Sequence, residues 1–234
     1  QAGGLHNAIP REASCVVSVP YAYKEQIRVD WNIFQADVEE EYSRTEKTME
    51  FILESVDAPE SVVDKKTARN LILALQAVDN GIFAMCQDID LVETSSNLAS
   101  IRKNAEEHTI VVNSSQRSSI LSARHNMAAT FRAPFELAGA EVVSGEGYPG
   151  WKMNPNSKLL VVAVEQYRKL YGKDPFVGGI HAGLECGLFS EKFPGMDMVS
   201  LGPTMRGVHS PDVRMLIPSV QLVWDHLLAI LANI

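Results

Sequence analysis

The stretch LVETSSNLASIRKNAEEHTIVVN, residues 91–113, contains two strand-like segments, Leu91–Arg102 and His108–Asn113. A helix is expected next, from about Ser118 to Ala138, because apolar residues recur there on one side at helical spacing. Pro134 lies inside this helical pattern, and proline removes a backbone donor and clashes with the preceding turn. The pattern therefore predicts strands followed by a helix that kinks or ends early at Pro134.

Strand-like and helical segments alternate in the same way on both sides of this stretch. Short β-branched or apolar runs predict strands at residues 13–19, 48–56, 177–180 and 198–201. Amphipathic segments predict helices at Tyr23–Arg44, from the N-cap Asp64 to Asn80-Gly81, at Ser157–Tyr171 and at Ser219–Leu231. The alternation favours an α/β fold with layers of helices on sheets.

The clearest break in the chain is residues 145–156, where three glycines and two prolines fall within a short span. We expect a domain boundary there. The chain is accordingly divided into residues 1–146 and residues 147–234.

The composition excludes several classes of protein. The chain has 234 residues, 46% of them hydrophobic, which is enough to bury a core. Its net charge is -8 and it has no basic run, so nucleic acid is not an expected partner. No apolar run approaches the roughly 20 residues that cross a bilayer. Three widely spaced cysteines fit a reducing, cytoplasmic location, and the start at Gln1 suggests that the true beginning is missing.

Two residues of the second part are candidates for chemistry. His209 lies in a loop between Gly207 and Pro211, where a neutral imidazole can be directed at a metal. Spacing alone favours the alternative, a histidine satisfied by hydrogen bonds. Glu185 lies in an apolar, glycine-punctuated context that suits a carboxylate receiving a ligand ammonium group, or equally a carboxylate at a helix start.

Two residues of the first part are candidates for substrate binding. Arg117 follows a strand and opens the next helix, a position suited to bidentate capture of a carboxylate. A solvated surface arginine is the common alternative, and Arg124 is a less favoured competitor. Asn7 lies in a turn, where its amide can bind a carbonyl or carboxylate, or simply close the turn.

Two further residues have weaker functional interpretations. His181 has no partner at metal-ligand spacing, so we interpret it as structural. Cys186 has no neighbouring base in the sequence that would generate a thiolate, so a cysteine hydrolase is only a weak alternative.

Several motifs resemble those of aminoacyl-histidine dipeptidases, also called cytosol non-specific dipeptidases, in the zinc aminoacylase and carboxypeptidase superfamily. The motifs occur in the same order and extend over nearly the whole chain. They are GGLHNAIPREA (3–13), NSSQRSS (113–119), LAGAEV (137–142), GYPGW (147–151), HAGLECGLF (181–189), DMVSLGPT (197–204) and HSPD (209–212).

The resemblance implies a fold and a place within it. Family members have an α/β catalytic domain that binds two zinc ions and an inserted α+β lid domain that commonly mediates dimerisation. Residues 1–146 would be the later part of the lid, and residues 147–234 the C-terminal segment of the catalytic domain. The chain would thus be the C-terminal half of a cytoplasmic, homodimeric enzyme.

The resemblance also implies roles for four residues. His209 matches the last zinc ligand, Glu185 the residue near the substrate amino terminus, and Arg117 the lid arginine that binds the substrate carboxylate. Asn7 lies in the matching lid motif and is a candidate for substrate contact. Val213 departs from the glutamate that follows HSPD in many relatives.

The expected activity is hydrolysis of dipeptides, including Xaa-His types such as β-alanyl-histidine. In the family, zinc lowers the pKa of a bound water and a glutamate takes its proton. That glutamate and the other zinc ligands would lie upstream of this chain, so the segment alone is expected to be inactive. The alternative is a non-catalytic dimerisation or binding protein that reuses the fold.

Overall fold

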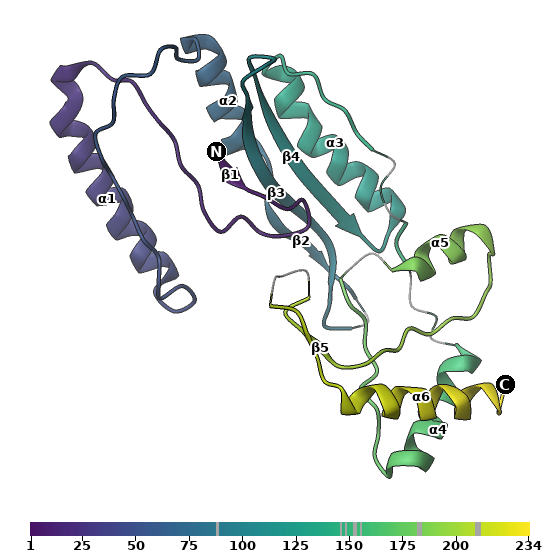
Figure 1. Ribbon diagram of the computed structural model, residues 1–234. Helices are drawn as coiled ribbons and strands as arrows, with labels where there is room; N and C mark the ends of the chain where they lie inside the picture. The colour runs from purple at the N-terminus through teal and green to yellow at the C-terminus, as the bar shows by residue number, and fades with distance from the viewer. Residues whose placement is uncertain are drawn as a thin grey trace.

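A computed structural model of the chain describes residues 1–234 apart from residues 88, 146, 148, 152, 153, 155, 182, 183 and 209–211. The first part contains an antiparallel sheet with two helices on one face, and the second part is mainly helical (Figure 1). Helices and strands are both present, as the predicted α/β class requires. Within the described residues, no helix is long and apolar enough to cross a bilayer.

The central strand of the sheet is β3 (Val92–Asn104), which pairs antiparallel with three others. One edge of β3 pairs with β4 (Thr109–Ser118). The other edge pairs with β2 (Gly81–Met85) near the start of β3 and with β1 (Ala2–Gly3) further along. The two strands expected in residues 91–113 are confirmed, and both extend beyond their predicted ends.

Strand β2 begins at the Asn80-Gly81 pair, which the sequence pattern predicted only as the end of a helix. Asn80 does follow the helix, and its side-chain oxygen accepts a hydrogen bond of 2.7 Å from the backbone N–H of Leu98 on β3. The helix-ending residue therefore also anchors the next strand to the sheet.

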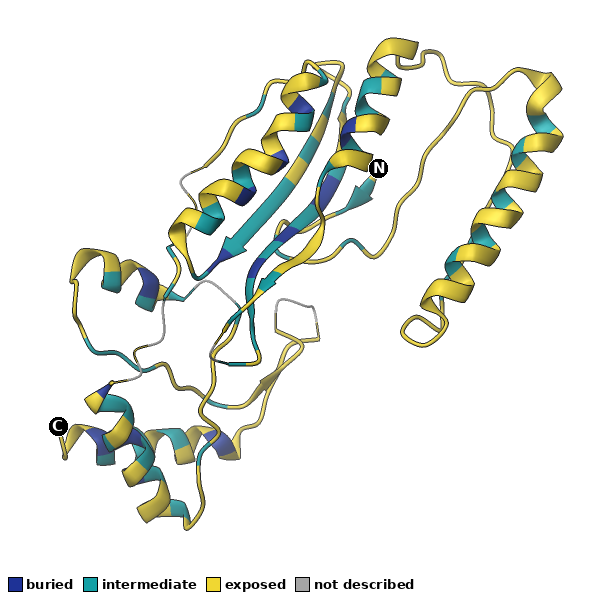
Figure 2. Cartoon of the chain, turned by 180° about the vertical axis from the view of Figure 1, so that it is seen from behind, coloured by how far each residue is buried: buried dark blue, intermediate teal, exposed yellow. Residues whose placement is uncertain are grey.

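Helices α2 (Lys65–Ala77) and α3 (Leu121–Leu137) pack together on one face of the sheet. Their buried side chains include Ala74 of α2 and the rings of Phe131 and Phe135, whose centroids lie 5.4 Å apart. Half-buried residues of the strands pack against them: Leu98 and Val112. Most of the buried residues of the first part gather between these helices and the sheet (Figure 2).

The start of α2 and the end of α3 both lie close to their predicted positions. Asp64 is the N-cap of α2 and accepts hydrogen bonds of 3.0 Å from the backbone N–H groups of Lys66 and Thr67. Pro134 lies within the last turn of α3, which continues to Leu137. Pro134 removes one intrahelical hydrogen bond, and α3 ends at Leu137, next to the predicted end at Ala138.

Helix α1 (Lys24–Tyr42) follows the short 3-10 helix η1 (Tyr21–Tyr23) and stands apart from the sheet (Figure 1). It packs mainly against its own following segment, where the ring of Phe51 lies 6.3 Å from Trp31 and 6.2 Å from Phe34. The helix predicted in this region is confirmed.

The strands predicted beside α1, at residues 13–19 and 48–56, are wrong. Both segments are extended, yet only Ala13 forms an isolated bridge, to Ala2. A strand requires a neighbouring backbone for its ladder of hydrogen bonds. Among the described residues, only the start of the first segment has such a neighbour, where Ala13 and Ser14 lie beside residues 1–3. The rest of both segments has no paired backbone, although their side chains have the composition of strands.

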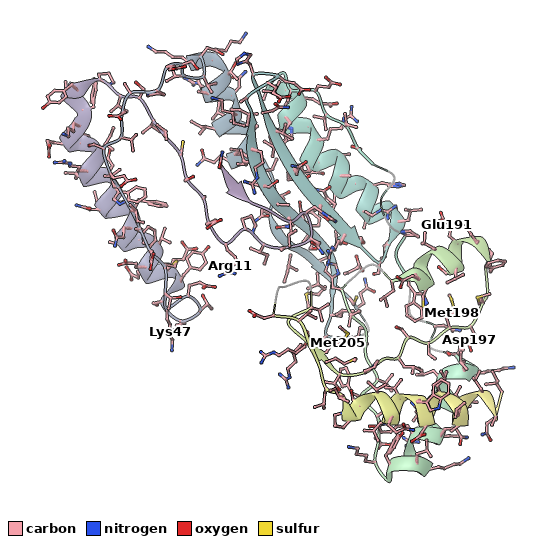
Figure 3. All side chains as sticks on the ribbon, viewed as in Figure 1. Arg11, Lys47, Glu191, Asp197, Met198 and Met205 are labelled. Atoms are coloured by element: carbon pink, nitrogen blue, oxygen red, sulfur yellow. The ribbon has the colours of Figure 1, made fainter. Side chains whose placement is uncertain are left out.

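The second part is built on two helices, α4 (Lys158–Tyr171) and α6 (Pro218–Leu231), as predicted. The ring Nε2 of His226 lies 2.7 Å from the carbonyl oxygen of Ala163, which joins α6 to α4. Asp197, labelled in Figure 3, accepts a hydrogen bond of 2.9 Å from the backbone N–H of Leu159 in the first turn of α4.

The strands predicted at residues 177–180 and 198–201 are also wrong, because these extended segments have no paired backbone in the described part of the chain. The sheet of the second part is instead a two-stranded pair, β5 (Met205–Arg206) with β6 (Arg214–Met215). A short helix that the sequence pattern did not predict, α5 (Glu185–Lys192), lies between them and α4 in the chain.

We predict that Phe131→Ala lowers the free energy of unfolding by roughly 3 to 5 kcal/mol, because it leaves a cavity in the core of α2, α3 and the sheet. Phe176→Ala is the matched control, since the Phe176 side chain is 95% exposed and supports no core. Denaturant unfolding of the two variants beside the unmodified chain measures both effects. Equal losses in the two variants would contradict this assignment of the core.

Candidate functional site

Arg117 lies near the end of β4, on the face of the sheet opposite α2 and α3. The register pairs Thr94 with Ser118, and their buried hydroxyl oxygens lie 2.9 Å apart on the helix-covered face. Neighbouring residues of a strand point to opposite faces, so the next pair, Ser95 and Arg117, lies on the other face. Arg117 is half-buried there rather than fully solvated.

His181, from the second part of the chain, contacts this cross-strand pair. The Arg117 Nη1 donates a hydrogen bond of 3.2 Å to the backbone carbonyl oxygen of His181. The ring Nε2 of His181 lies 2.7 Å from Ser95 Oγ. The two strand residues thus hold one residue of the HAGLECG motif at both its backbone and its ring.

The pKa of the His181 imidazole is lowered from its ordinary value. Burial is the larger cause, since it penalises the charged ring, and the positive charge of Arg117 acts in the same direction. A hydrogen bond with the backbone of Val92 acts in the opposite direction, as the smallest of the three. The ring is therefore neutral at neutral pH.

Glu185 is the first residue of α5, four residues after His181, and its side chain is exposed. A carboxylate in the first turn of a helix is stabilised by the helix dipole. The helix-start interpretation of Glu185 thus describes its position, and its exposure also leaves it open to a ligand.

Helix α5 lies beside the end of β4 (Figure 1), because two glycines allow close backbone approaches. A Cβ on Gly187 would lie 2.2 Å from the Pro149 carbonyl oxygen, and a Cβ on Gly150 would lie 2.7 Å from the Ser118 carbonyl oxygen. The Pro149-Gly150 segment is therefore packed between α5 and the residue after Arg117. The glycines of two motifs thus bring α5 close to Pro149 and bring Gly150 close to Ser118, the residue after Arg117.

Asn7 lies in a loop that is fixed over the same face of the sheet. The side-chain amide of Asn97 donates to the carbonyl oxygens on either side of Asn7, at 3.4 Å to His6 and 2.9 Å to Ala8. Asn97 is two residues from Ser95 on β3, so the loop lies along the strand from the Arg117 pair. Asn7 is half-buried.

Sequence analysis missed Ser95 and Asn97, and it interpreted His181 as structural. The available signal was the run Thr94-Ser95-Ser96-Asn97, which places polar residues on both faces of a strand. Such a run is unusual for a strand with one buried face, but it does not identify the partners of each side chain.

Arg124, the competing arginine, lies in the first turn of α3. Its Nη1 is 3.6 Å from the place that a Cβ on Gly147 would occupy, so it contacts the start of the GYPGW motif. Arg117 is the arginine whose hydrogen bond to the His181 carbonyl oxygen is on record in this structure.

The predicted zinc ligand His209 lies outside the described residues. In the described part of the chain, no group of three His, Cys, Asp or Glu side chains lies close enough to bind a metal ion. A catalytic zinc site requires three protein ligands. The described residues therefore do not form a zinc site on their own.

Cys186 is half-buried in α5 and lines an open groove of about 480 Å³ between α4, α6 and the segment around residue 200. The groove is lined largely by aliphatic side chains: Leu159, Val199, Leu201, Val223, Leu227 and Ile230. A thiol in such surroundings packs as a small apolar group, which favours the structural interpretation of Cys186.

Known proteins are similar to this chain in sequence and in fold. The chain is 35% identical over 237 residues to a cytosol non-specific dipeptidase of Escherichia coli (strain K12), covering 99% of this chain and 48% of that protein. It superimposes on the crystal structure of aminoacylhistidine dipeptidase from Vibrio alginolyticus with a TM-score of 0.85 and 36% identity, covering 100% of this chain and 47% of that one. The chain is similar over its whole length to aminoacyl-histidine dipeptidases. No family model matches it.

The resemblance drawn from the motifs is thereby confirmed, and the match fits the C-terminal half of these dipeptidases. The chain spans about half the length of both dipeptidases. An aminopeptidase of Bacillus cereus, at 18% identity, shares the fold over 70% of this chain and 44% of its own, with a TM-score of 0.53.

We predict that the His181 ring titrates below the ordinary histidine range, and that Arg117→Met moves its pKa part of the way back. Only part of the pKa shift is reversed, because burial of the ring is the larger cause of the shift. NMR of the ring protons against pH measures both values. An unchanged His181 pKa in the variant would contradict the contact with Arg117.

The same shift predicts the direction of a pH effect on stability. The folded chain binds the His181 proton less tightly than the unfolded chain does. The contribution of His181 to the free energy of unfolding is therefore complete at a pH above the His181 pKa of the unfolded chain. It is lost as the pH falls from that value through the lower His181 pKa of the folded chain. His181→Gln is the control, since its unfolding should lack this part of the pH dependence.

Proposed function

We propose that this chain is part of a zinc-dependent dipeptidase that hydrolyses dipeptides, including Xaa-His types such as β-alanyl-histidine. The observation that carries the proposal is the meeting of Arg117 with the loop that leads to Glu185, on the sheet face beside the Asn7 loop. A dipeptide has a carboxylate at one end and an ammonium group at the other. A cation and an anion from two different motifs, brought to one region, suit such a ligand.

Arg117 is proposed to bind the substrate carboxylate. Within the described part of the chain, Arg117 forms no ion pair, whereas Arg28, Arg132 and Arg168 each pair with a carboxylate. Its contact with His181 is with a neutral carbonyl oxygen, which leaves the positive charge without a counter-ion. A half-buried guanidinium gains from a carboxylate partner, and its planar fork can bind both carboxylate oxygens.

Glu185 is proposed to receive the substrate ammonium group, and Asn7 to contact the peptide between the two ends. The exposed Glu185 carboxylate at the start of α5 is accessible to a ligand. The Asn97 amide uses both flanking carbonyls of Asn7, so the Asn7 side chain can be presented without disturbing the loop.

The proposal places residues 1–146 in the later part of a lid domain and residues 147–234 in the C-terminal segment of a catalytic domain. Zinc is the proposed cofactor, and His209 is the ligand that this chain would contribute. The remaining ligands and the general base would come from a longer protein, so the 234-residue chain alone would be inactive. A homodimer formed through the lid domain and a cytoplasmic location belong to the same proposal.

The test is hydrolysis of β-alanyl-histidine and of ordinary dipeptides by the full-length protein. We expect turnover that a chelator abolishes and added zinc restores, and no turnover by the 234-residue chain. A zinc-loaded full-length protein that binds or dimerises without turnover would favour a non-catalytic protein that reuses the fold. Turnover by the 234-residue chain alone would overturn the proposed division of the active site.

We predict that Arg117→Met in the full-length protein raises the KM for dipeptides by about tenfold to a hundredfold, because a charge-assisted hydrogen bond is lost. Arg124→Met is the matched control and should leave KM nearly unchanged. A dipeptide with an amidated C-terminus is the second control, since without a carboxylate the Arg117 variant and the unmodified enzyme should differ little. A larger effect of Arg124→Met would assign carboxylate binding to that residue.

A further inference from the structure

Ser95 and Arg117 form a bracket around His181. They face each other across β3 and β4, and each binds a different part of His181: Ser95 the imidazole, Arg117 the backbone carbonyl. His181 lies 86 residues from Ser95 along the chain and 64 residues from Arg117. Contacts between parts so distant in sequence fix how the His181 loop lies against the sheet.

The start of α5 lies close to the bracket along the chain. Glu185 follows His181 by four residues, and α5 is held on its other side by the close approach of Gly187 to Pro149. Arg117 contacts His181, and Glu185 is joined to His181 by a short stretch of chain.

We propose that His181 is a positioning residue which, held by Ser95, fixes the separation of Arg117 and Glu185 and so restricts the substrate to two residues. This inference rests on the proposed dipeptidase function, in which these two side chains bind the opposite ends of the substrate. His181 itself touches neither substrate nor metal in this scheme; it acts through Arg117 and the start of α5.

The chemistry of the contact suits this role. A neutral imidazole and a hydroxyl can exchange donor and acceptor roles, so the bond of 2.7 Å forms without adding charge. The lowered pKa of His181 keeps the ring neutral beside Arg117. A lysine or arginine at position 181 would instead place a second cation next to Arg117 and compete for the same carboxylate. The bracket orients Arg117 while leaving its charge available.

The experiment uses the zinc-loaded, full-length protein and compares a dipeptide with the tripeptide that extends it. Ser95→Ala should raise the KM for the dipeptide by about tenfold, the effect of one lost hydrogen bond. His181→Ala should raise it by at least as much, because it also removes the hydrogen bond with the backbone of Val92. In both variants kcat should change less than about twofold. The ratio of kcat/KM for dipeptide over tripeptide should fall by a similar factor, because the separation of the two ends is no longer fixed.

Two matched variants separate positioning from general damage. Ser115→Ala removes a hydroxyl from the same face of the sheet, two residues from Arg117 along β4, and should leave both KM and the ratio unchanged. Ser95→Thr keeps the hydroxyl and should restore dipeptide selectivity that Ser95→Ala loses. The thermal midpoint of every variant is measured beside the kinetics. If Ser95→Ala proves unfolded, the KM and the selectivity of the folded Ser95→Thr variant still test the role of the hydroxyl.

A double variant tests whether the two residues act through one bond. If they do, Ser95→Ala combined with His181→Ala raises KM no further than His181→Ala alone. Additive effects would overturn the proposal, as would an unchanged dipeptide-to-tripeptide ratio in the single variants.

Failure of this inference can be distinguished from failure of the proposed function. If Arg117→Met raises KM and the bracket variants do not, only the role of His181 is lost. If the zinc-loaded protein hydrolyses no dipeptide, or if Arg117→Met leaves KM unchanged, the proposed function or its carboxylate site is lost first.

Discussion

The pairing of β3 with three other strands is the constraint on which the first part of the molecule depends. Its ladder with β4 fixes which side chains share a face, and a shift of one residue would exchange the faces. In the observed register, Leu98 and Val112 meet the helices while Ser95 and Arg117 meet the His181 loop. The same hydrogen bonds therefore determine both the core and the candidate site.

Except for the short helix α5, the helices could be predicted from the sequence because their signals are local. Asp64 and Ser157 cap α2 and α4, as their positions before apolar periodic segments indicate. The strand predictions at residues 13–19, 48–56, 177–180 and 198–201 were wrong because strand composition says nothing about an available partner. Where β3 supplied a long partner, the prediction for residues 108–113 was confirmed and the strand proved longer.

The candidate site could be predicted only in part for a similar reason. Arg117, Glu185 and Asn7 lie in motifs that the sequence makes visible, and their roles remain proposals. His181 had no partner at a recognisable spacing, since its partners lie 64 and 86 residues away and depend on strand register. The closeness of α5 to β4 depends on Gly150 and Gly187, because a Cβ at either position would meet backbone atoms of another segment. The sequence shows that these positions are glycines, but it does not show which segment lies against them.

Helix α1 shares little surface with the sheet and is joined to it by long extended segments on both sides. Its amide protons should therefore exchange with solvent through local opening of the helix and Phe51, rather than through unfolding of the sheet. The buried amides of β3 should exchange only when the whole first part opens. One polypeptide would thus contain two cooperative units, and a destabilising change in α1 would leave the protection of β3 intact.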